Sequence, residues 1–124
     1  MTTSESVGQT IDLARVEDAA ARLHAYVRRT PTELSEPLSE LTGRELTLKL
    51  ENLQHTGAFK IRGALSRLLA MPPEVRAGGV ITASAGNHGL GVALAARLLG
   101  ISATVVVPTT VPLAKLTAIQ RQGA

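Results

Sequence analysis

Short β-branched segments alternate with helical segments along the second half of the chain, and this alternation most constrains the fold. Apolar residues recur at helical spacing over 61–69, and nearly every position over 90–99 is apolar. Strands are predicted at 80–83 and 103–107, and a last helix over 112–122. This order predicts right-handed crossovers and a parallel sheet, so we expect an α/β chain with part of a three-layer αβα arrangement.

The first half is less regular. Apolar residues at helical spacing predict an amphipathic helix over 11–27, with Thr10 or Asp12 as its N-cap. The alternating run over 46–50 predicts a strand. The polar residues 1–10 are predicted to be a disordered tail.

Composition excludes several classes of function. Aromatic residues make up 2% of the 124 residues, too few for a surface that stacks nucleic-acid bases. The net charge of +3 comes from scattered basic residues, and no cysteine is present for disulfides or thiolate metal sites. The start lacks an apolar signal segment, and the apolar stretch over 89–100 is too short for a bilayer. We therefore expect a cytoplasmic protein without nucleic-acid or membrane partners.

Lys60 stands at a predicted strand-to-helix junction, within the run 51–64. Small residues flank it on both sides, as a planar ligand lying against the backbone would require. A lysine forms a Schiff base only when its amine is neutral part of the time, and both burial and a neighbouring cation such as Arg62 favour that form. The alternative is an ordinary solvent-facing lysine.

The run Ser84-Ala85-Gly86-Asn87-His88-Gly89 joins a predicted strand to a predicted helix. Ligands of open parallel sheets bind at such junctions, where the helix start offers N–H groups to an anion. The glycine spacing matches neither the dinucleotide fingerprint nor the P-loop. Tight packing between strand and helix is the alternative explanation of these glycines.

Other constellations are poor candidates for a site. His24, His55 and His88 are far apart in the sequence and show no ligand-pair spacing, so no metal site is expected. Ser84 has no visible histidine and acid partners for a hydrolase triad.

With both runs in view, the chain resembles the threonine dehydratase (threonine ammonia-lyase) family of pyridoxal-phosphate (PLP) enzymes, which have the tryptophan synthase β-like fold. The similarity lies in 49–64 and 84–89, with weaker matches over the rest of 11–124. It implies PLP as cofactor and L-threonine, with L-serine, as substrate. The products would be 2-oxobutanoate or pyruvate, and ammonia.

The resemblance also implies residue roles. Lys60 would bind PLP covalently and remove the α-proton, Phe59 would pack near the cofactor, and Asn87 would hydrogen-bond its ring oxygen. The substrate carboxylate would be held by a set of loop residues, largely through their backbone N–H groups: Ser84, Ala85, Gly86, Asn87 and His88.

One position separates relatives within the family. Serine racemases carry a second serine at the place of Ala85, where it acts as acid and base on the opposite face. Alanine cannot move a proton, so we expect elimination without efficient racemisation. Serine racemase and hydroxyaspartate dehydratase remain the alternatives among enzymes.

The chain is short for this family. The resemblance implies that 11–52 belong to a large domain and 53–124 to the first part of the small PLP-binding domain. The phosphate-binding loop would lie beyond position 124, so the chain alone is expected to be an inactive N-terminal portion of a homo-oligomeric enzyme of amino-acid metabolism, in isoleucine biosynthesis. A non-catalytic truncated fragment is the alternative from another class, and a dinucleotide-binding module is a distant third.

Overall fold

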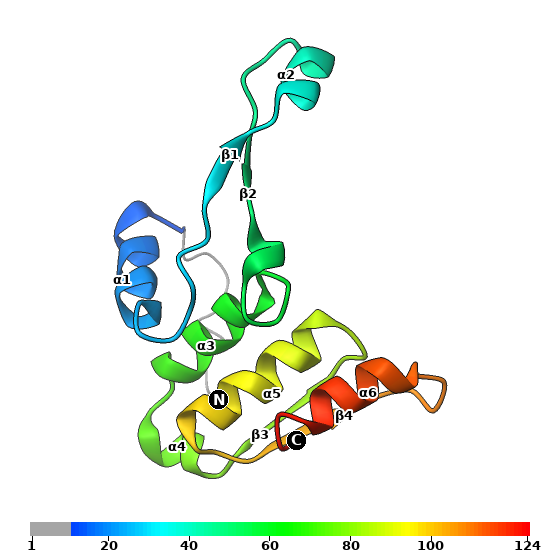
Figure 1. Ribbon diagram of the computed structural model, residues 1–124. Helices are drawn as coiled ribbons and strands as arrows, with labels where there is room; N and C mark the ends of the chain where they lie inside the picture. Colours follow the sequence, from blue (N-terminus) through cyan, green and yellow to red (C-terminus); the bar gives the residue numbers. More distant parts are fainter. Residues whose placement is uncertain (1–10) are drawn as a thin grey trace, which may run out of the picture.

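The computed structural model describes residues 11–124 (Figure 1), and the tail predicted at 1–10 lies outside this range. The helices are α1 (Leu13–Leu23), α2 (Glu36–Thr42), α3 (Lys60–Ala70), α4 (Pro73–Ala77), α5 (Asn87–Leu99) and α6 (Leu113–Gln120). The strands are β1 (Thr32–Leu34), β2 (Thr47–Lys49), β3 (Val80–Ala83) and β4 (Ala103–Val106), and a 3₁₀ turn, η1, spans Glu51–Leu53.

The predicted parallel pair is present. β3 and β4 run in parallel, with Val80 opposite Ala103, and α5 connects the two strands. α5 packs against both strands and α6 packs against α5 (Figure 1). The α/β fold class predicted from the sequence is therefore confirmed.

Helices cover one face of this sheet. Val105 lies on the covered face, because its side chain comes within 3.0 Å of a Cβ built on Gly89 of α5. On the opposite face Ile81 and Val106 remain 73% and 52% exposed. Residues 11–124 thus supply the sheet and one helical layer of the expected αβα arrangement.

The core is formed where α3 packs against α5. Ile61 and Leu65 of α3 are completely buried, and Ala95 of α5 is buried against them. The α1 residue Leu23 extends this cluster from the other side of α3. The nearly apolar α5 is buried over 89, 91 and 92–96, as its composition predicted.

A separate antiparallel pair projects from this body and carries α2 at its tip (Figure 1). The strand predicted over 46–50 is β2, and its partner is β1, with Thr32 opposite Lys49. The sequence indicated only extended backbone near Pro31, so β1 was missed. The leucines on this arm are exposed: Leu34, Leu38, Leu41 and Leu48.

Capping decides several helix ends. Asp12 accepts a hydrogen bond of 2.9 Å from the Arg15 N–H, which confirms it as the N-cap of α1, but the helix ends at Leu23 rather than at 27. The two prolines at 72 and 73 end α3 as predicted, yet Pro73 also opens α4, which was not predicted. A proline at the first helical position leaves no hydrogen bond unmade, so it can start a helix as well as stop one.

The glycine that ends α5 offers a test of this backbone. Gly100 has a φ of 67°, and no heavy atom lies within 4 Å of a Cβ built there. Gly100→Ala is expected to lower the free energy of unfolding by about 1–2 kcal/mol, because an L residue is strained in this conformation. Gly63→Ala, equally free of contacts but inside α3, is expected to raise it by about 0.5–1 kcal/mol. Urea unfolding followed by circular dichroism measures both, and equal effects would contradict the backbone account.

Candidate active site

Lys60 is the first residue of α3 and its side chain is exposed. Its Nζ atom lies 5.0 Å from the ring centroid of Phe59, which is itself 59% exposed. Arg62 is ion-paired with Glu51 at 2.7 Å. Of the two conditions expected to favour a neutral amine, burial is absent in this structure and the charge of Arg62 is compensated.

A close backbone contact places the start of α3 beside α5. A Cβ built on Gly91 would lie 3.2 Å from the carbonyl carbon of Lys60 and 3.2 Å from the Ile61 nitrogen. Only glycine allows the helices this separation without a shift of one of them. Asn87 is one helical turn before Gly91, so it lies on the adjoining part of the same face of α5.

The loop from β3 to α5 is held by one hydrogen bond to β4 and one within the loop. The Ser84 N–H donates to the Val106 carbonyl at 3.0 Å, and the Gly86 N–H donates to the Ser84 hydroxyl at 3.2 Å. Two of the N–H groups assigned to a substrate carboxylate are thus engaged, while the hydroxyl of Ser84 remains able to donate. α5 begins after Gly86 without a capping side chain, so the N–H groups of its first turn are open to an anion.

Packing accounts for two glycines near this loop. A Cβ on Gly89 would lie 2.4 Å from the Ser84 carbonyl oxygen, and Gly91 is close to Lys60 as described above. The alternative explanation of the glycines, tight packing between strand and helix, therefore applies to Gly89, while Gly91 allows close packing between two helices. The same packing brings the loop and the lysine into one region.

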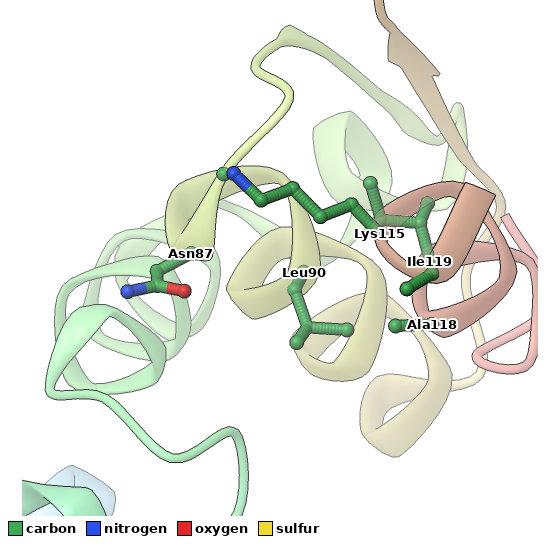
Figure 2. A pocket seen from close by; sticks show the side chains of 7 residues that line it. Asn87, Leu90, Lys115, Ala118 and Ile119 are labelled. Atoms are coloured by element: carbon green, nitrogen blue, oxygen red, sulfur yellow. The ribbon is translucent and has the colours of Figure 1, made fainter. Parts of the chain in front are cut away.

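The loop residues face two different hollows. Gly86 and Asn87 line a cavity of about 180 Å³ between α5 and α6, where Figure 2 shows Lys115 extended from α6. His88 lines a groove of about 410 Å³ between α3, α5 and β3. The sequence did not single out Lys115 as a site residue, and only the packing of α6 on α5 reveals it.

A polar network behind Lys60 was also missed. Arg62 donates to both carboxylate oxygens of Glu51, at 2.7 and 2.9 Å, and the Thr30 hydroxyl donates to the same carboxylate at 2.5 Å. These hydrogen bonds lower the pKa of Glu51 to about 2, and the hydrogen bond from Arg62 makes the largest contribution. The Glu51 carboxylate in turn raises the pKa of Arg62. Opposite charges inside one motif were the only sequence signal for this pair.

Within residues 11–124 no group of three or more His, Asp or Glu side chains could hold a metal ion. None of the helices in that range is long and apolar enough to cross a membrane.

The family model described as "Pyridoxal-phosphate dependent enzyme" matches residues 23–124. The chain belongs to this family. This match confirms the family resemblance found in residues 49–64 and 84–89, and it confirms PLP as the cofactor of the family.

Relatives narrow the similarity. The chain is 49% identical over 114 residues to "L-threonine ammonia-lyase" of Thermotoga maritima, a match that covers 92% of this chain and 28% of that protein. The structure of maize serine racemase matches with a TM-score of 0.84 and 41% identity, over 91% of this chain and 34% of that one. A threonine deaminase of T.th. matches with a TM-score of 0.79 and 42% identity, over 92% and 35%. The chain thus spans about a third of its relatives' length.

The donor set of this PLP family member suits the cofactor. An exposed primary amine at Lys60 can react with an aldehyde, and the amide of Asn87 can donate to a ring oxygen from the neighbouring helix. Phe59 presents an exposed apolar ring next to the lysine. The residues present therefore fit the group.

The Glu51 carboxyl gives a pH-dependent prediction. Its pKa is about 2 in the folded chain against an ordinary value of 4.5, so the folded state binds this proton more weakly than the unfolded state. The stabilisation is therefore complete above pH 4.5 and is lost as the pH falls toward 2. Urea unfolding between pH 7 and 3 is expected to show a smaller loss of stability in Glu51→Gln than in the wild-type chain. Glu40→Gln on α2 is the control, and an equal change in both variants would contradict the assignment.

Proposed function

We propose that the chain is the N-terminal part of a PLP-dependent threonine ammonia-lyase, which converts L-threonine to 2-oxobutanoate and ammonia and L-serine to pyruvate and ammonia. The observation that carries this is the contact of Gly91 with the backbone of Lys60, which places the first residue of α3 against α5 one helical turn after the open start of that helix. The 49% identity to a protein named L-threonine ammonia-lyase supports the choice of reaction.

In this proposal Lys60 does two things. Its Nζ atom would hold the cofactor and, as a neutral amine, would take the proton from Cα of the substrate. When bound, PLP supplies a ring system that accepts the electrons left at Cα. Asn87 orients the ring through its side-chain amide, and Phe59 shields the lysine from one side. The β-hydroxyl would leave with a proton as water, and the resulting enamine would tautomerise to an imine that water hydrolyses to the 2-oxo acid and ammonia.

The substrate carboxylate is assigned to the loop before α5. The open N–H groups at 87–89 and the positive end of the helix dipole suit an anion, and the Ser84 hydroxyl can add a further hydrogen bond. Ala85 and His88 complete this cradle through backbone N–H groups, and Gly86, whose own N–H donates to the Ser84 hydroxyl at 3.2 Å, orients that hydroxyl. Because the Ser84 N–H already donates to the Val106 carbonyl, only the hydroxyl of Ser84 can donate to the substrate carboxylate.

Other parts of the proposal concern the whole protein. The groups that hold the phosphate and the pyridine nitrogen are assigned to parts that the relatives have beyond this third of their length. We assign 11–52 to the large domain and 53–124 to the small one, supported by the separate sheets of β1–β2 and β3–β4. A homo-oligomer in the cytoplasm that serves isoleucine biosynthesis completes the proposal.

Serine racemase is the second candidate, because the maize enzyme matches with a TM-score of 0.84. The residue at 85 argues against it. Ala85 is half-buried in the loop and has no group that can give a proton to the face of Cα opposite Lys60.

The full-length protein is expected to release 2-oxobutanoate from L-threonine with little D-threonine or D-serine, as chiral chromatography of the reaction mixture would measure. Ala85→Ser supplies a hydroxyl at this position and is expected to raise the ratio of racemisation to elimination. Substantial D-amino acid from the unaltered protein would contradict the assignment in favour of a racemase.

The role of Lys60 is tested by titrating the 124-residue chain with PLP, reducing with borohydride and mapping the labelled peptides. Pyridoxyl label at Lys60 is expected, lost in Lys60→Ala and retained in the control Lys49→Ala, which changes β2 and not the cavity at Gly86 and Asn87. Label spread evenly over Lys49, Lys60 and Lys115 would contradict a formed site in this chain. The same mapping on the full-length protein, together with release of ammonia from L-threonine, then distinguishes a truncated enzyme from a non-catalytic protein.

A further inference from the structure

We propose that Thr30, Glu51, Gln54 and Arg62 form a clasp that positions Lys60 by holding the first turn of α3. These four residues are called the clasp below. The inference rests on the proposed function, since it concerns how the reactive lysine is held. It assigns positioning roles to residues that do not themselves touch the reacting atoms.

The charged half of the clasp is a bidentate ion pair between Glu51 and Arg62. The Arg62 Nε–Oε2 and Nη2–Oε1 distances to Glu51 are 2.9 and 2.7 Å. The side chain of Glu51 is 14% exposed and that of Arg62 is 31% exposed, so water screens the ion pair weakly. The hydroxyl of Thr30, a residue 4% exposed, donates to the same carboxylate.

The neutral half is the side-chain amide of Gln54, a residue 3% exposed. Its oxygen accepts from the Arg28 N–H at 3.0 Å, and its nitrogen donates to the Arg28 carbonyl at 2.9 Å. The same amide oxygen accepts from the His55 N–H, and Arg62 donates to the Arg28 carbonyl at 3.0 Å. The segment before β1, the turn η1 and helix α3 are thereby joined through hydrogen bonds, most of them partly buried.

Helical geometry links this network to the lysine. Successive residues of an α-helix point about 100° apart, so Lys60, Ile61 and Arg62 point in three different directions. Ile61 is completely buried in the core and Arg62 is held by Glu51. With two directions fixed, the helix cannot rotate, and Lys60 is directed away from both the core and the clasp.

The clasp also compensates for a missing cap. α3 starts after Phe59 without a capping side chain, following a loop that turns at Gly57 with a φ of 69°. An uncapped first turn frays readily, because no side chain accepts from its N–H groups. In α3 the Arg62 N–H donates to the Phe59 carbonyl at 3.0 Å. Arg62, in this first turn, ties it to η1, which gives the first turn the order that a cap would otherwise supply.

The decisive variant is Glu51→Gln, which keeps the shape of residue 51 and removes its charge. Hydrogen exchange of the amides over 62–64 is expected to rise about tenfold in the 124-residue chain, since one lost hydrogen bond to a charged group is of that order. The fraction of pyridoxyl label at Lys60 relative to Lys115 is expected to fall severalfold. Exchange over 65–68, deeper in α3, is expected to change less.

Asp18→Asn is the matched control, because it breaks the exposed ion pair with Arg22 on α1, away from the first turn of α3. It is expected to change neither readout. Thr30→Val, which removes one hydrogen bond to Glu51 and keeps the ion pair, is expected to give a smaller shift in the same direction and serves if Glu51→Gln does not fold.

If Glu51→Gln lowers global stability but leaves the exchange over 62–64 and the label ratio as in Asp18→Asn, the clasp is merely structural and the inference is overturned. An unaltered chain without label at Lys60 counts against the proposed function of this chain instead. In that case the exchange measurement still decides whether the clasp orders the first turn.

Discussion

The backbone contact between α3 and α5 is the constraint on which the rest of the structure depends. At Gly91 the two helices are so close that a Cβ built on this glycine would lie 3.2 Å from the Lys60 carbonyl carbon. This closeness lets Ile61 and Leu65 reach complete burial against α5. Because α5 also packs on β3 and β4, the same contact fixes the lysine relative to the strand ends where the loop at 84–88 begins.

Two kinds of interaction hold α3 on two different faces. Apolar burial against α5 is strong but non-directional, and it leaves a helix some freedom to slide or rotate. The pair of Glu51 and Arg62 is directional, because a guanidinium meets a carboxylate in one plane and in one register. The core accounts for the position of the helix, and the polar side accounts for its rotation. This explains why Arg62, two residues after Lys60, is ion-paired with Glu51 and does not point toward the lysine.

Apolar patterning in the sequence predicted α1, α3, α5 and the strands β2, β3 and β4. It missed β1, which is as short as β2 but lies in a mostly polar segment without the alternation that 46–50 shows. It missed α4 because five residues show no helical repeat and the prolines beside them can end or begin a helix. Lys60 was found because a motif carried it. Its exposure, the partner of Arg62 and the position of Lys115 depend on contacts between distant segments, which no local pattern contains.

The fold alone does not decide between a lyase and a racemase. Maize serine racemase and a threonine deaminase match this chain with TM-scores of 0.84 and 0.79, so both chemistries occur on one scaffold. Both reactions begin with removal of the α-proton, which one lysine can perform. They differ in what happens next: racemisation needs a second proton donor on the opposite face, whereas elimination needs only a leaving group at Cβ. That difference depends on a single side chain, and at position 85 the chain has a methyl group, which has no proton to give.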